Sequence, residues 1–131
     1  MKIRSGFVSN SSTSSFILIV TEDAHQGVLK HIPEEYHPML NYGFRETKVF
    51  GRPARVFTIL SDHGGSYSSM CLEYCREDIS FPCPPPKIQP EGMDLPRRAQ
   101  EPECEYELKN AYEEILKIVA PDGFFSKSIG D

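Results

Sequence analysis

The apolar run Phe16–Val20 constrains the fold of this chain more than any other feature. It consists of five consecutive apolar residues, among them β-branched ones that favour strands, and the hydroxyl-rich segment Ser9–Ser15 comes directly before it. The polar tripeptide Thr-Glu-Asp follows at once, so the run falls far short of the roughly 20 apolar residues that a membrane span needs. We therefore expect a buried strand in a central position, covered on both faces.

The N-terminal segment before this strand is polar and carries a recognisable pattern. Six Ser or Thr residues and one Asn fill Ser9–Ser15. The stretch from Arg4 to Phe16 resembles a signature, Arg-x-Gly-Phe-Val-Ser-Asn-Ser-Ser-Ser-Ser-Ser-Phe, found at the N-terminus of small, mostly uncharacterised phage and bacterial proteins. Thr13 replaces one serine of that signature, and the match covers about a tenth of the chain. The resemblance implies an origin and names no activity.

We expect residues 1–15 to form a flexible arm that becomes ordered when a partner binds, because small polar side chains offer little to a core. The arm residues that we expect to contact the partner are Phe7, Val8, Ser9, Asn10, Ser11, Ser12 and Thr13.

The residues after the strand predict a helix and then a hairpin. Thr21 can cap a helix with two acidic residues in its first turn, and Pro33 would end it. Further on, Arg45–Phe50 and Ala54–Leu60 are rich in β-branched and aromatic residues and flank a Gly-Arg-Pro turn. The composition of residues 61–66 predicts a loop.

Prolines divide the C-terminal half into an irregular segment and a helix. Seven of the eleven prolines lie between Phe81 and Pro102, which predicts an extended strap without regular structure. The following helix has glutamates near its start, an apolar stripe from Leu108 to Val119, and Pro-Asp-Gly after its end.

These elements predict an α+β fold with a small mixed sheet of three or four strands and two helices packed on it. We expect residues 16–131 to form a single domain that includes the proline-rich strap 81–102.

The charges are unevenly distributed and disfavour two classes of partner. Residues 101–131 carry eight acids and three lysines, which accounts for the whole net charge of −5. Bulk binding of nucleic acids or anionic membranes is therefore not expected. The local exception is Arg45, Lys48, Arg52 and Arg55, opposed only by Glu46. We expect Arg52 and Arg55 to belong to a partner-binding surface.

One motif suggests an enzyme instead. The strand-like residues 56–60 run into Ser-Asp-His-Gly, which resembles the metal-ligand motif of the alkaline phosphatase and sulfatase superfamily. The resemblance implies that Asp62 and His63 bind a divalent metal, and it makes a small metal-dependent phosphoester- or nucleotide-processing enzyme our alternative function. The chain is much shorter than those enzymes, so we favour a polar turn at this position.

The cysteines offer a second candidate metal site. Cys71, Cys75 and Cys83 together with His63 have the residue types of a Cys3His zinc site. A usual zinc site combines two closely spaced pairs of ligands. Only one such pair, Cys71 and Cys75, occurs here. We therefore expect no zinc and no other cofactor.

No nucleophile, base and orienting group emerge together from the sequence. We expect a non-enzymatic accessory protein, encoded by a phage or prophage, that acts by protein–protein contact on a host factor or as a minor component of a particle. It would be located in the cytoplasm of the bacterial host or in the virion. The sequence does not indicate an oligomeric state.

Overall fold

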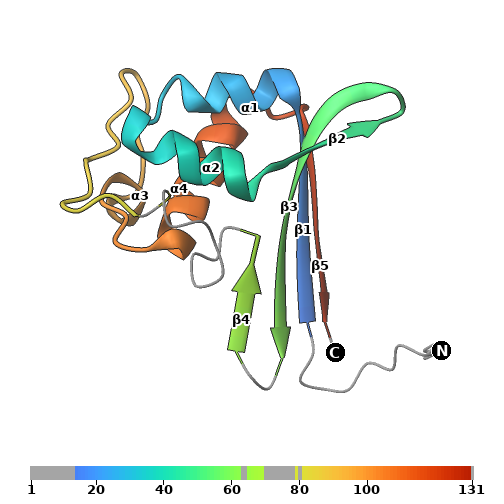
Figure 1. The fold of residues 1–131 in the computed structure, drawn as a ribbon. Helices are drawn as coiled ribbons and strands as arrows, with labels where there is room; N and C mark the ends of the chain where they lie inside the picture. Colours follow the sequence, from blue (N-terminus) through green and yellow to red (C-terminus); the bar gives the residue numbers. More distant parts are fainter. Residues whose placement is uncertain (1–13, 63–64, 70–78, 80, 131) are drawn as a thin grey trace.

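A single antiparallel sheet with helices on one of its faces forms the framework of the molecule (Figure 1). The computed structural model describes residues 14–62, 65–69, 79 and 81–130. The strands are β1 (Ser14–Thr21), β2 (Arg45–Val49), β3 (Arg52–Asp62), β4 (Gly65–Ser68) and β5 (Phe124–Gly130). Their order is β2–β3–β1–β5, and β4 pairs with the far end of β3. The α+β fold class is confirmed.

The pairing within the sheet differs from the prediction. Every strand pair among the described residues is antiparallel, so the sheet is not mixed. β3 and β5 both begin at the end of the sheet where β1 finishes, because Thr21 pairs with Ala54 and Val20 pairs with Phe124. The segments that contain the helices therefore bring the chain back to the end of the sheet where β1 finishes. Because β3 and β5 both start there, both run antiparallel to β1.

The predicted central strand is present, but only one of its faces is covered. β1 lies between β3 and β5 and already includes Ser14 and Ser15, which we had assigned to the arm. Leu18 and Val20 are fully buried towards the helices, whereas Ile17 and Ile19 on the other face remain partly exposed. Coverage on both faces was therefore wrong, because the described helices all lie on one side of the sheet (Figure 1).

The helical layer begins where the sequence predicts it. Thr21 caps α1 (Glu22–Leu29), since the backbone N–H of Ala24 donates to its Oγ1 at 3.1 Å. The helix ends at Leu29, four residues before Pro33. The layer also contains the short 3₁₀ helix η1 (Glu34–Tyr36), α2 (His37–Gly43), α3 (Arg97–Gln100) and α4 (Glu105–Val119), which is more helices than the two predicted.

Two hairpins flank the long strand β3. The first was predicted, but its turn is formed by Phe50 and Gly51, so that Pro53 belongs to β3 and lies opposite Lys48. The second joins β3 to β4 and was missed, because the glycines and serines of residues 61–66 have the composition of a loop. Pairing with β3 overrides that local preference.

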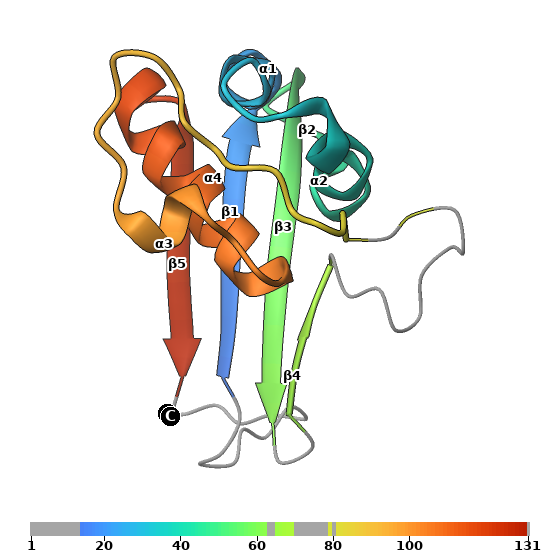
Figure 2. The ribbon, with the colours of Figure 1, turned by 90° about the vertical axis from the view of Figure 1, so that its left-hand side faces the viewer.

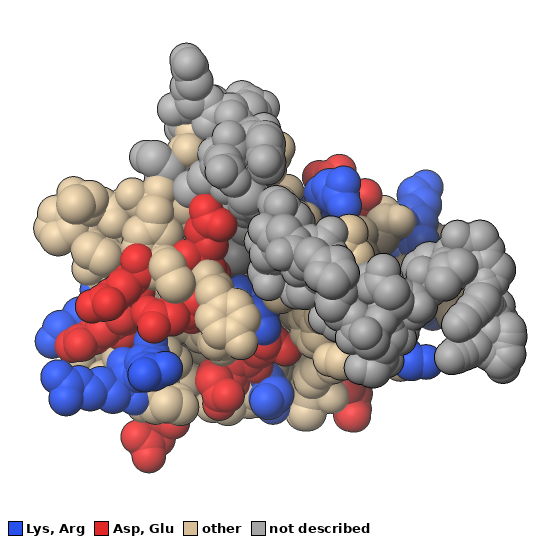
Figure 3. Space-filling view, turned by 90° about the horizontal axis from the view of Figure 1, so that it is seen from below, with Lys and Arg blue, Asp and Glu red and all other residues tan. Residues whose placement is uncertain are grey.

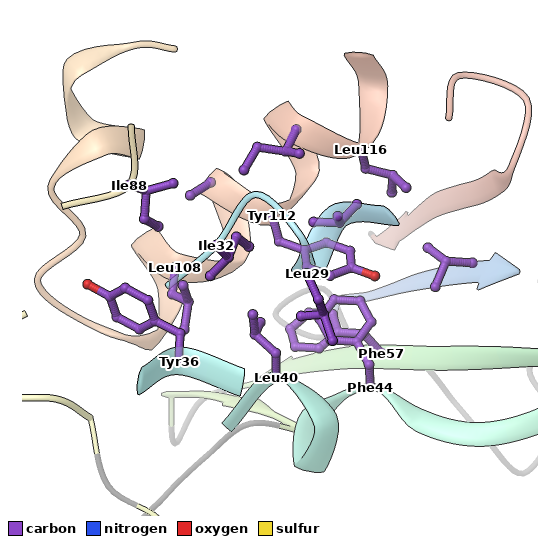
Figure 4. Packing of buried hydrophobic residues seen from close by; sticks show 14 of the residues in the cluster. Leu29, Ile32, Tyr36, Leu40, Phe44, Phe57, Ile88, Leu108, Tyr112 and Leu116 are labelled. Carbon is purple, nitrogen blue, oxygen red and sulfur yellow. The ribbon is translucent and has the colours of Figure 1, made fainter. Parts of the chain in front are cut away.

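The strap and α4 complete the core. The strap has no regular element from Phe81 to Pro96, but α3 lies inside the range 81–102 that we predicted to be irregular, so that part of the prediction was wrong. The strap crosses the helices, and its residues Ile88 and Leu95 are buried (Figure 2). The apolar stripe of α4 is buried from Leu108 to Leu116, and Tyr112 stacks on Phe44 at a ring distance of 4.2 Å (Figure 4). The helix layer and one sheet face thus share one core. None of the described helices is long and apolar enough to cross a bilayer.

Candidate functional site

The sheet face opposite the helices carries several partly exposed apolar residues and has no described element lying over it (Figure 1). Paired residues of neighbouring antiparallel strands point to the same side. Ile17 and Ile19 therefore share this face with Val56 and Leu60 of β3 and with Phe125 of β5. Leu60 is 52% exposed and Phe125 is 56% exposed, and the other three side chains are partly exposed. We call these five residues the open face.

The charges beside the open face are positive. Lys127 lies opposite Ile17, and Arg45 lies opposite Val56, so the strand register places both on this side of the sheet. Both side chains are exposed. The register places no acidic residue here among the strand residues whose side chains the structure describes. A partner of the open face would therefore be apolar at its centre and acidic at its margin.

The β2–β3 hairpin extends beyond the sheet on the same side as the open face. β1 pairs with β3 only from Ala54 onwards, so the turn and the residues next to it have no third strand beside them. The hairpin bends away from the helices (Figure 1). Lys48 and Arg52 are exposed near its tip.

The tip of the hairpin is an aromatic residue in a conformation that aromatic residues rarely adopt. Phe50 has φ 52°, Gly51 has φ 79°, and two successive positive φ angles are typical of a type I′ turn. Such turns favour Asn-Gly, because an ordinary side chain is crowded in the left-handed region. The side chain of Phe50 is also 100% exposed. Neither feature contributes to the packing of the described residues.

A buried polar cluster joins the helices to the sheet on the other face. His25 is fully buried, its Nε2 donates to Oδ1 of Asn41 at 2.9 Å, and its Nδ1 accepts from the hydroxyl of Tyr112 at 2.7 Å. Burial lowers the pKa of His25, although the hydrogen bond to Asn41 opposes the shift and the charge of Arg55 adds to it. Burial also raises the pKa of Tyr112. Burial thus favours the neutral form of the ring, and the two hydrogen bonds hold the ring between α2 and α4.

Arg55 belongs to this cluster rather than to the surface. Its Nε donates to Oε1 of Glu22 at 2.9 Å, and its Nη1 donates to the carbonyl oxygen of Phe44 at 3.1 Å. The hydrogen bond from Arg55 is the main reason that the pKa of Glu22 is lowered. With 8% of its surface exposed, Arg55 joins α1 to the end of α2. It is not available to a partner, which corrects our prediction, whereas Arg52 is exposed as a partner-binding residue needs to be.

The polar groups of the cluster are hydrogen-bonded within the fold. Its ring nitrogens, its hydroxyl and its guanidinium group are all engaged with one another or with backbone oxygens, and His25 has no exposed surface. We assign it the structural role of fixing the helices on β3. A depression of about 190 Å³ lined by strap residues between Ile88 and Gln100 is smaller than the sites that usually hold small ligands.

The candidate metal ligands lie mostly outside the described residues. His63, Cys71 and Cys75 are among the residues that the structure does not describe, and Asp62 is the last residue of β3. Cys83 is exposed in the strap. Within the described part of the chain, no three His, Cys, Asp or Glu side chains gather in a way that could hold a metal ion.

The arm residues predicted to bind a partner, Phe7, Val8, Ser9, Asn10, Ser11, Ser12 and Thr13, also lie outside the described residues. Sequence reasoning missed the exposed aromatic and aliphatic residues instead. Phe125 is followed by three polar residues, Ser126, Lys127 and Ser128, so the sequence has no apolar–polar alternation that would have marked this strand. Gly51 is typical of the second position of a two-residue turn, and Phe50 directly before it would be an unusual first residue of that turn.

Comparison of the chain with protein-family models, with curated proteins and with solved structures finds no match. Function has to be inferred from the geometry of the chain itself.

Proposed function

We propose that this protein is a non-enzymatic accessory protein that acts by binding another protein through its open face. The observation that supports this proposal is the exposed apolar layer formed by Ile17, Ile19, Val56, Leu60 and Phe125. In an antiparallel sheet with one covered face, the other face normally alternates to polar residues. On this face Thr58 lies between Val56 and Leu60, but apolar residues outnumber it, and such a group is more typical of a site that becomes covered by another protein.

The origin of the protein enters the proposal through the N-terminal resemblance. The phage and bacterial proteins that share the signature favour a phage- or prophage-encoded chain, which would act on a host factor or within a particle. The charges support a protein rather than a nucleic acid as partner, because Lys, Arg, Asp and Glu are interspersed on the described part of the surface in Figure 3.

The experiment compares proteins captured by three forms of the tagged full-length chain. The first is the wild type, the second carries Leu60→Glu with Phe125→Glu, and the third carries Ile118→Glu. Ile118 is a matched control, because it is 51% exposed on α4 and lies away from the open face. Captured proteins are quantified by mass spectrometry, and circular dichroism verifies that each form is folded.

We expect at least one protein to be captured by the wild type and by Ile118→Glu, and to be reduced more than fivefold with the open-face variant. Two glutamates on the open face would bring charges into an apolar contact and would repel the acidic margin expected of the partner, so both effects oppose binding. Equal capture by all three forms would contradict the proposal.

A further inference from the structure

We propose that the tip of the β2–β3 hairpin is a docking finger, in which the ring of Phe50 enters an apolar pocket of a partner protein whose rim is acidic. This inference rests on the proposed function, since it supposes a protein partner on the side of the open face. It concerns different residues, however, so the two can be tested separately. We call residues 48–52 the finger.

The first argument is the combination of exposure and backbone conformation at one residue. Phe50 is completely exposed, and it occupies the left-handed region at φ 52°. Both features oppose stability, since a polar Asn at this position would fit the turn and leave no apolar ring in water. Strained residues that persist in this way are concentrated at ligand-contacting sites.

The second argument is the shape of the finger. β2 pairs with β3 in a regular register from Arg45–Val56 to Val49–Arg52, so the turn is held by a short two-stranded ribbon. The ribbon fixes the direction in which Phe50 points before a partner arrives. Aromatic residues with few rotatable bonds are effective anchors in interfaces for this reason, because ordering them costs little entropy.

The third argument is the charge around the ring. Lys48 and Arg52 are exposed on either side of Phe50, and Arg45 follows at the base of the ribbon. Glu46, the single acid of the ribbon, lies 3.4 Å from the guanidinium group of Arg55 and partly compensates that buried cation. The charges available to a partner at the tip are thus positive, which is complementary to carboxylates at the rim of a pocket.

An anionic membrane or a nucleic acid would also attract a basic tip with an aromatic ring. Both are less favoured, because the finger offers only a few cations and the chain as a whole carries a net charge of −5. A pocket that fits one ring gains its affinity from burying that ring and needs few charges.

The test uses the full-length protein with the photoreactive residue benzoylphenylalanine at one position. In one form it replaces Phe50, and in the control form it replaces Tyr106, an aromatic residue of α4 that is 63% exposed. Each form is mixed with an extract of the bacterial host cells and is then irradiated. Cross-linked products are identified by mass spectrometry at the level of the peptide that carries the adduct.

We expect a discrete protein adduct from position 50 that position 106 does not give. The adducted peptide should line an apolar pocket with Asp or Glu residues around it. Introducing Lys48→Glu with Arg52→Glu should reduce the adduct at least tenfold. A tenfold excess of unlabelled wild type should compete for the adduct, whereas the same excess of Phe50→Asn, which keeps the turn, should not.

Three results would overturn the inference. The first is an equal yield of adducts from positions 50 and 106, and the second is an adduct that is insensitive to charge reversal. The third is a cross-link to nucleic acid without any cross-link to protein. Membrane binding would overturn the inference as well, if the wild-type protein floated with phosphatidylglycerol–phosphatidylethanolamine vesicles and Phe50→Ala abolished this flotation. An adduct that survives Leu60→Glu with Phe125→Glu would leave the finger in place and contradict the role of the open face.

Discussion

At the scale of single residues, the turn at Phe50 separates stability from binding. Replacing Phe50 by Asn should raise the free energy of unfolding by about 1 kcal/mol, because Asn tolerates the left-handed conformation that disfavours other residues. Urea unfolding followed by circular dichroism measures this change. The effect is unusual in direction, since most substitutions destabilise a protein.

The control for this prediction is Phe50→Ala. Alanine removes the exposed ring and keeps the Cβ atom that is crowded at φ 52°. Its free energy of unfolding should therefore stay within about 0.5 kcal/mol of the wild type. A loss of stability in Phe50→Asn would show that the ring supports the fold, and it would remove the main argument for the finger.

The buried His25 should make stability depend on pH. Its pKa is lowered in the folded state by burial, so between that value and the ordinary pKa of about 6.5 the unfolded chain binds a proton that the folded chain does not. The free energy of unfolding should therefore fall as the pH drops below about 6.5. The lowered pKa of Glu22 acts in the same direction, but only at a pH below its ordinary 4.5.

Thermal melts between pH 7.5 and pH 5 test this dependence. The groups that act on the ring of His25 are the hydroxyl of Tyr112, the amide of Asn41, and the charges of Arg55, Glu22 and His37. His25→Gln should flatten the dependence of the melting temperature over this range. His31→Gln, which lies outside the cluster, should preserve it, and an unchanged slope in His25→Gln would assign the dependence to another group.

At the scale of elements, α4 holds the helix layer on the sheet through one side. Leu116 is fully buried, so Leu116→Ala should reduce the free energy of unfolding by about 2–5 kcal/mol. The carboxylate of Glu114 is partly exposed and lies 3.9 Å from Nζ of Lys117, so Glu114→Ala should cost less than about 0.5 kcal/mol. Chemical denaturation measures the free energy of unfolding of both variants. Similar losses in the two variants would show that Leu116 is not on the buried side of α4.

The elements also show which parts of the structure a single sequence can predict. β1 and α4 have patterns that are decided locally, by an uninterrupted apolar run and by a stripe with helical spacing. β4 has only four residues, of the types Gly, Ser and Tyr, and the seven residues of β5 include Ser126, Lys127 and Ser128. Their local strand signals are weak, and pairing with β3 and β1 makes them strands.

The candidate site was harder to predict than the fold for a related reason. The uninterrupted apolar run of β1 gives no indication that Ile17 and Ile19 face outwards, because an apolar residue is compatible with both sides of a sheet. Arg55 was assigned to the surface because arginine usually lies there. Its burial depends on Glu22, 33 positions earlier in the chain, which no local pattern reveals.

At the scale of the whole molecule, the layers are asymmetric. One face of the sheet carries the helices, the strap and the buried polar cluster, and the other carries the open face beside the bent hairpin (Figures 1 and 2). The side that stabilises the fold is thus separate from the side that we propose to bind. Variants on the open face can therefore alter binding without altering the core, which is why they are suitable as tests.

The two ends of the chain should differ in their importance for folding. Deleting residues 1–10 leaves β1 whole, because β1 begins at Ser14, so the thermal midpoint should hardly change while partner binding weakens.

Deleting residues 124–131 removes β5, which pairs with β1 from Ser14 to Val20, and removes Phe124 from the edge of the core. That truncation should lose cooperative unfolding, because the central strand would become an edge with unpaired backbone groups. Calorimetry of both truncations measures the contrast. If the N-terminal truncation also lost its cooperative transition, residues 1–10 would be part of the folded structure, and the division between a binding arm and a folding domain would be wrong.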